Sequence, residues 1–148
     1  MATHVNPFPP FHLAFPVRDI EETRAFYVNA LGCTVGREAK RWIDFDFFGH
    51  QISAHVREGE LTHNPSNTVD GDAVPIRHFG CILDMNNWYQ LRDQVTAYGV
   101  EFIVGPKVRF VGKPGEQATM FFCDPSGNAL EFKAFADMNR IFAKQNDE

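Results

Sequence analysis

Two histidines and one glutamate stand where an internal repeat of the sequence could bring them together. His12 and His78 lie 66 positions apart, each near the beginning of a short apolar stretch. Glu131 is the single carboxylate between apolar neighbours in GNALEFKAF, and a glutamate in a buried strand needs a partner for its charge. Two imidazoles and one carboxylate suit Fe(II), and a cation would compensate the carboxylate. The pattern therefore predicts that these three residues are metal ligands.

Simpler interpretations of the same residues stay open on sequence grounds. A histidine at the beginning of a strand is more often hydrogen-bonded or half-exposed than a ligand. Glu131 could face solvent on a half-buried strand, and Lys133, which would share its face, agrees with that alternative. The prediction of a metal site is supported against these alternatives because His12 and His78 occupy the same position in the two repeats.

The elements that must position these residues also repeat along the chain. FHLAFPVRDIEETRAFYVNALG aligns with RHFGCILDMNNWYQLRDQVTAYG, and each copy predicts an apolar strand followed by a helix with an apolar stripe. Both copies close on glycine, the usual signal for the end of a helix. RWIDFDFFGHQISAH resembles EQATMFFCDPSGNALEFKAF, and each predicts a strand, a glycine turn and a strand. With one further strand between the helix and the hairpin, each half is a βαβββ unit.

The predicted organisation is one α+β domain in which two βαβββ units form a cleft between curved mixed sheets. If a pseudo-twofold axis relates the units, His12 and His78 approach it from opposite sides, and aligning the two glycine turns places Glu131 opposite Ser53. The expected bounds are 1–148 for the domain, 11–57 for the first unit, 58–76 for a turn-rich linker, 77–135 for the second unit and 135–145 for a short amphipathic C-terminal helix.

Composition bounds the class of protein. The 148 residues fit one domain, with 44% hydrophobic and 22% charged residues. The net charge of −5 without a basic cluster argues against nucleic acid, and no apolar run is long enough for a membrane helix. Three cysteines without CxxC spacing, and an N-terminus without the features of a signal peptide, predict a cytoplasmic protein without a zinc framework.

Two motifs resemble those of a known superfamily. The helix motif FYxxxLG, present as FYVNALG, and the strand motif DPxGNxxEF, present as DPSGNALEF, are similar to those of the vicinal oxygen chelate proteins, also called the glyoxalase, bleomycin resistance and extradiol dioxygenase superfamily. The resemblance covers about residues 11–135. It implies a glyoxalase-like fold of paired βαβββ units, with metal ligands on the first strand of each unit and on the final strand. It also implies a small-molecule substrate and a homodimer.

The resemblance directs attention to a fourth ligand position, which glyoxalase I enzymes generally fill from the fourth strand of the first unit. The matching strand here, HQISAHV, offers Gln51, Ser53 and His55 by parity. Ser53, the repeat equivalent of Glu131, is a poor ligand, although Gln51 could bind through its carbonyl. His55 is a candidate acid–base group beside the metal, or a water-bonded histidine at a strand end.

A metal site with three strong protein ligands resembles the sites of the extradiol dioxygenases or the fosfomycin-modifying transferases more closely than that of glyoxalase I. A two-histidine, one-carboxylate set favours Fe(II) or Mn(II), with Zn or Ni possible. The first functional hypothesis is therefore a metal-dependent oxidoreductase, an extradiol-type ring-cleaving dioxygenase that binds two neighbouring substrate oxygens. The alternatives are a glyoxalase-like lyase, isomerase or transferase with a non-redox metal, and a metal-free drug-binding protein.

Substrate contacts are predicted on the second unit. The irregular segment PKVRFVGKPGEQ carries three cations, of which Arg109 is the preferred partner for a substrate carboxylate, and Gln117 is predicted to point into the cleft. Together with His55, these residues form the predicted catalytic set. One phenylalanine from each of the pairs Phe45/Phe47 and Phe121/Phe122 could form an aromatic wall, with core packing as the simpler alternative.

Overall fold

The computed structural model describes residues 8–61, 66–69 and 72–144 of the chain. The chain divides into two compact units, each described by itself below. The first contains Met1–His63 and Asp124–Asn128, and the second contains Asn64–Cys123 and Ala129–Glu148. The sequence-based division placed all of 77–135 in the second unit, whereas the structure groups the turn at 124–128 with the first.

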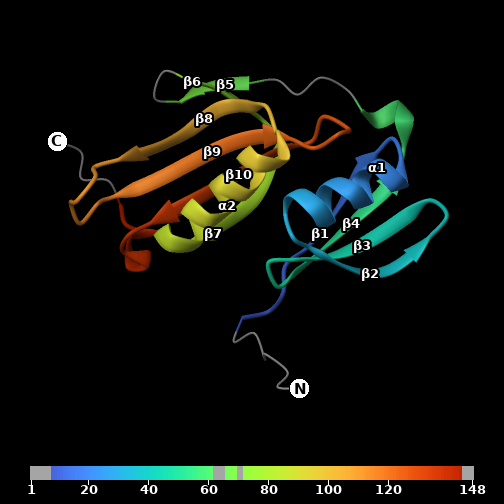
Figure 1. Cartoon of the computed structure of the whole chain (residues 1–148), viewed down its shortest axis with the longest axis horizontal. Helices are drawn as coiled ribbons and strands as arrows, with labels where there is room; N and C mark the ends of the chain where they lie inside the picture. The colour runs from blue at the N-terminus through green and yellow to red at the C-terminus, as the bar shows by residue number, and fades with distance from the viewer. Residues whose placement is uncertain (1–7, 62–65, 70–71, 145–148) are drawn as a thin grey trace. The chain divides into compact units, whose positions relative to one another are not determined.

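The first unit is a four-stranded mixed sheet with one short helical segment (Figure 1). The strand order is β1-β4-β3-β2, in which β1 and β4 are parallel and the other pairs are antiparallel. The elements are β1 (His12–Val17), α1 (Ile20–Ala25), the π-helical turn η1 (Phe26–Ala30), β2 (Thr34–Ala39), β3 (Trp42–Phe47), β4 (His50–Val56) and the 3₁₀ turn η2 (Glu58–Glu60).

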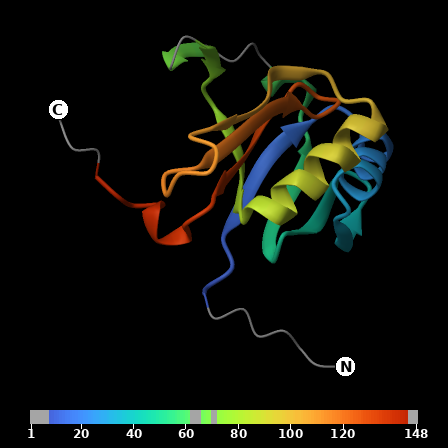
Figure 2. The same ribbon diagram turned by 60° about the vertical axis from the view of Figure 1, so that its left-hand side comes forward.

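The second unit repeats this topology, with the strand order β7-β10-β9-β8 and a parallel β7–β10 pair. Helix α2 packs along β9 and β10 and leaves the other face of the sheet uncovered by a helix (Figures 1 and 2). The elements are β5 (Ser66–Val69), β6 (Asp72–Pro75), β7 (His78–Leu83), α2 (Met85–Tyr98), β8 (Phe102–Arg109), β9 (Gln117–Cys123), β10 (Ala129–Phe135) and the 3₁₀ turn η3 (Met138–Arg140). The predicted fold of two βαβββ units is thus confirmed.

The helices begin and end where local chemistry directs them. Asp19 and Asp84 each accept a hydrogen bond of 2.8 Å from a backbone N–H of the first helical turn, as N-cap residues do. Gly32 and Gly99 follow the two helical segments at φ angles of 74° and 100°, a conformation that favours glycine. The N-cap residues Asp19 and Asp84 lie 65 positions apart, whereas the two histidines lie 66 positions apart. The difference arises because the connection from β1 to α1 contains one more residue, Arg18, than the connection from β7 to α2.

Aromatic side chains fill the space between each sheet and its helix. Tyr27 stacks on Phe45 with ring centroids 5.0 Å apart. In the second unit Phe122 stacks on Phe132 at 5.7 Å, and Trp88 Nε1 donates to the Phe132 carbonyl oxygen at 2.9 Å. Phe45 and Phe122 are therefore core residues, which is the simpler of the two alternatives for these positions.

Two segments differ from their predicted structure. The C-terminal helix expected over 135–145 is wrong for the described residues, because β10 continues to Phe135 and only the 3₁₀ turn η3 follows. Phe142, an apolar residue of this segment, is 94% exposed, and an isolated helix of this length is not stable without packing. The linker 58–76 contains η2 and the antiparallel pair β5–β6. Within the described residues, no helix has the length and apolar character needed to cross a membrane.

Candidate functional site

A cavity of about 270 Å³ lies on the face of the second sheet that helix α2 does not cover. Four of the predicted ligand and catalytic residues line it, namely His78, Arg109, Gln117 and Glu131. Arg109 on β8 and Gln117 on β9 are direct partners in the strand register. The structure therefore brings together the predicted site residues that belong to the second unit.

Glu131 reaches the cavity from the centre of strand β10. It pairs with Gly80 on β7 and with Phe121 on β9, and it is buried with 7% exposure. A Cβ atom on Gly80 would lie 1.6 Å from the Glu131 carbonyl oxygen. Glycine is therefore required on β7 at this position, because any side chain would push away the strand that carries the carboxylate.

His78 is oriented by a backbone carbonyl that sequence reasoning missed. Its Nδ1 donates to the Pro75 carbonyl oxygen at 2.5 Å. A carbonyl only accepts hydrogen bonds, so this contact assigns the proton to Nδ1 and leaves the lone pair of a neutral imidazole on Nε2. The ring also stands edge-on to Phe121, with centroids 5.0 Å apart. No sequence signal could locate this partner, since every residue has a carbonyl.

The pair of His78 and Glu131 fits a bound cation. His78 Nε2 lies 3.7 Å from Glu131 Oε2, so two acceptor atoms face each other when the imidazole is neutral. A metal ion between them would satisfy both, and an Nδ1–H bound to a carbonyl is the usual support of a ligating histidine. Lys133 Nζ lies 3.5 Å from the other oxygen, Oε1, and supplies a second way to neutralise the carboxylate.

Neither unit by itself gathers three His, Cys, Asp or Glu side chains as a metal site among its described residues. His12, the third predicted ligand, is the first residue of β1 in the first unit, where it is exposed and pairs with Gln51 on β4. His55, also in the first unit, is exposed, and its ring centroid lies 6.5 Å from that of Trp42. Their roles stay predictions.

Ser53 has a different partner from a metal ion. It pairs with Ala14 as Glu131 pairs with Gly80, which confirms their equivalence in the two sheets. Its Oγ donates to Asp44 Oδ1 at 2.6 Å. The hydroxyl therefore serves to hold a buried carboxylate.

Asp44 itself is a buried carboxylate that the sequence analysis did not single out. It is 4% exposed. Arg37 Nε lies 3.4 Å from Oδ2, which is within ion-pair distance but not aligned as a hydrogen bond. The alternation WIDFDF already placed Asp44 opposite the apolar face of β3, which was the available signal for this position.

Comparisons with known proteins agree with this topology. The family model for the Glyoxalase/Bleomycin resistance protein/Dioxygenase superfamily matches residues 10–132. A glyoxalase/bleomycin resistance protein/dioxygenase from Alicyclobacillus acidocaldarius is 33% identical, with a TM-score of 0.73 over 93% of this chain and 99% of that one. The fosfomycin resistance protein FosX from Listeria monocytogenes shares the fold, with 19% identity and a TM-score of 0.63 over 90% and 94% of the two chains. Virulence protein STM3117 of Salmonella typhimurium is 25% identical over 124 residues, 84% of this chain and 82% of its own length.

Proposed function

The chain belongs to the glyoxalase/bleomycin resistance protein/dioxygenase superfamily, and from that premise we propose that it is a metal-dependent enzyme acting on a small molecule with two neighbouring oxygens. The observation that carries the proposal is the pair of His78 and Glu131 in one cavity. The Pro75 carbonyl holds His78 at Nδ1, and Nε2 lies 3.7 Å from Glu131 Oε2. A buried carboxylate beside such an imidazole is the chemistry that a divalent cation needs.

The proposed ligands are His78 and Glu131 from the second unit and His12 from the first. A nitrogen and oxygen donor set of this kind suits Fe(II) or Mn(II), and Zn or Ni would also bind. When bound, the ion supplies a positive charge for the negative charge that develops on two adjacent substrate oxygens. The proposal includes a homodimer, the state that the family resemblance implies, and the cytoplasmic location that the cysteine content and the N-terminal sequence predict.

The protein's own side chains hold and orient the substrate. Arg109 and Gln117, neighbours across β8 and β9, offer hydrogen-bond donors to polar groups of the substrate. Phe121 gives the cavity an apolar wall next to the ligand pair. His55 is proposed to move a proton, and its exposed position on β4 leaves the imidazole accessible.

Extradiol ring cleavage is the first reaction to test. The protein is reconstituted with Fe(II), and oxygen uptake is measured with a panel of catechols. We expect uptake by the wild type and none by the double variant His78→Ala, Glu131→Ala. If oxygen uptake is absent while a thiohemiacetal is turned over with Ni or Zn, the non-redox lyase or isomerase replaces the dioxygenase.

A metal-free binding protein is the second candidate, and Lys133 is the observation that favours it. Its ammonium group and the His78 imidazole could neutralise Glu131 without a metal ion. Elemental analysis after reconstitution separates the two candidates. The metal enzyme predicts about one ion per chain in the wild type and a large loss in the double variant. Equal, low metal contents in both would leave the binding protein.

A further inference from the structure

We propose that Lys107, Thr119 and Lys133 form a subsite for a carboxylate of the substrate, next to the predicted metal ligands. The proposal rests on the proposed function and names its substrate class: a small apolar or aromatic carboxylic acid that carries two neighbouring oxygens. All three residues line the same cavity as His78 and Glu131.

Strand register places the three side chains in one row across the sheet. Lys107 on β8 pairs with Thr119 on β9, and Thr119 pairs with Lys133 on β10. The neighbouring row contains Phe121 and Glu131, two residues along each of β9 and β10. Two strand residues span roughly 7 Å, which is about the distance from a ring hydroxyl to a carboxylate across an aromatic ring. An acid group could therefore occupy the lysine row while two oxygens face the ligand pair.

The hydroxyl of Thr119 also points to a ligand. Its Oγ1 is buried and has no hydrogen-bond partner among the described residues. Buried hydroxyls are nearly always hydrogen-bonded in folded proteins, and an exception needs an explanation. A hydroxyl flanked by two lysines is a suitable donor to an oxyanion, because the ammonium groups attract the anion to the hydroxyl.

The charges that line the cavity favour a single negative charge on the acid group. Its lining has three cations against two carboxylates: Lys107, Arg109 and Lys133 against Asp72 and Glu131. Lys107 forms an ion pair with Asp72, and Lys133 lies 3.5 Å from Glu131. The excess of one positive charge matches a carboxylate better than a doubly charged phosphonate.

The remainder of the lining favours an apolar body for the ligand. Val74 on β6, Val104 on β8 and Phe121 on β9 form one buried apolar cluster, and each of them lines the cavity. An aromatic or branched aliphatic group would gain from contact with this wall. The acid group would then lie against the lysine row, at the polar side of the same space.

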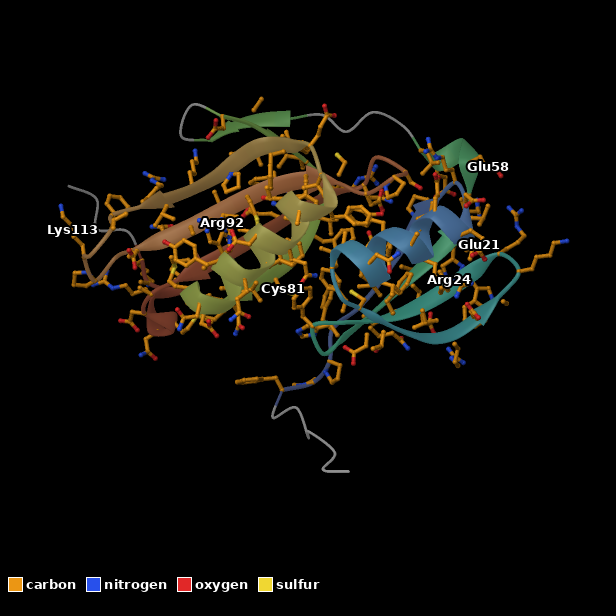
Figure 3. The ribbon with its side chains drawn as sticks, in the orientation of Figure 1. Glu21, Arg24, Glu58, Cys81, Arg92 and Lys113 are labelled. Carbon is orange, nitrogen blue, oxygen red and sulfur yellow. The ribbon has the colours of Figure 1, made fainter. Side chains whose placement is uncertain are left out.

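The experiment is calorimetric titration of the metal-free protein with benzoate, benzamide and phenylphosphonate. We expect benzoate to bind about tenfold more tightly than neutral benzamide, because charge-assisted hydrogen bonds form only with the acid. Lys133→Met and Thr119→Val should each weaken benzoate binding by about fivefold to tenfold and leave benzamide binding unchanged. Lys113→Met is the matched control, since Lys113 is exposed on the β8–β9 connection and is not part of the lining (Figure 3).

Several results would overturn the proposal. Equal affinities for benzoate and benzamide, or no measurable binding of benzoate, would remove the acid subsite. An equal loss in Lys113→Met would show a diffuse effect of charge. Phenylphosphonate binding much more tightly than benzoate would replace the carboxylate with a dianion. Because the titration uses metal-free protein, absence of oxygen uptake would contradict the dioxygenase without changing this result.

Discussion

At the scale of single residues, the orientation of one imidazole decides what the cavity can do. His78 could act as a cation beside Glu131 or as a neutral ligand, and in both roles the Pro75 carbonyl accepts from Nδ1 and leaves Nε2 as the atom beside Glu131. This contact is present without a metal ion, so Nε2 is held in place in advance of binding. Preorganisation of this kind raises affinity without a new contact.

Lys133 competes with a metal ion for Glu131, and its removal should strengthen metal binding. The ammonium group lies 3.5 Å from the carboxylate and would repel a cation bound there. Because the Lys133 side chain is 52% exposed, solvent screens much of this effect, and we expect only about a threefold to fivefold gain in affinity for Mn(II) in Lys133→Met. Competition with a chelating indicator measures it, with Lys113→Met as the control. Weaker metal binding in Lys133→Met would show that the lysine supports the site.

At the scale of elements, the close approach of β7 and β10 depends on Gly80. In Gly80→Ala the new Cβ would meet the Glu131 carbonyl oxygen at 1.6 Å, and the strands must separate to avoid it. We expect a loss of about 2 kcal/mol or more in the free energy of unfolding, together with weaker metal binding, because Glu131 moves with its strand. Urea denaturation and metal titration measure the two effects. Gly105→Ala on β8, where an added Cβ meets no atom within 4 Å, is the control; unaltered stability in Gly80→Ala would contradict the predicted clash.

The turn between β9 and β10 depends on a buried carboxylate with four hydrogen-bond donors. Asp124 accepts from the backbone N–H groups of Ser126 and Asn128, from the Asn128 side chain and from Tyr27 Oη, each at 2.9 Å. Burial nevertheless raises the pKa of Asp124 above its ordinary value of 3.8. The folded protein therefore holds the proton more tightly than the unfolded chain.

The raised pKa of Asp124 predicts how the difference in stability between the wild type and Asp124→Asn depends on pH. A raised pKa contributes stability that is fully present below 3.8 and is lost as pH rises through the folded pKa. Asparagine does not titrate, so the advantage of the wild type over Asp124→Asn should shrink as pH rises through this window. Urea denaturation of both proteins at steps from about pH 3.5 to about pH 7 measures the difference. An advantage that grows with pH would show that the hydrogen bonds outweigh burial.

The elements that could be predicted from the sequence are those whose signals are local. Asp84 and Gly99 mark the ends of α2 through capping and a positive φ angle. In the DPSGN turn, proline fixes one φ angle and Gly127 adopts a positive one. The prediction of a C-terminal helix was wrong because the spacing of apolar residues in this segment is helical, but the apolar Phe142 is exposed and does not pack against a core. The β5–β6 pair was missed because turn-forming residues dominate that stretch.

Across the full chain, the repeat predicted that His78 and Glu131 lie close together, because equivalent strands of the two units place equivalent residues on the same face of each sheet. The contacts that distinguish the two units depend on tertiary structure and were not predictable. Ser53 holds Asp44 in the first unit, whereas its equivalent, Glu131, lies beside His78 in the second. A sequence repeat thus predicts positions, while the chemistry at each position depends on neighbours from other strands.

The third ligand tests whether both units contribute to one metal centre. If His12 binds the same ion as His78 and Glu131, His12→Ala should lower Mn(II) affinity about as much as His78→Ala, by about tenfold or more. His55→Ala is the matched control from the same unit, because an acid–base residue affects turnover and leaves metal affinity almost unchanged. Both units then have to be present and folded for tight binding, so metal affinity reports on the whole chain rather than on one sheet. Full retention of affinity in His12→Ala would confine the metal chemistry to the second unit and remove the symmetric argument from which the site was predicted.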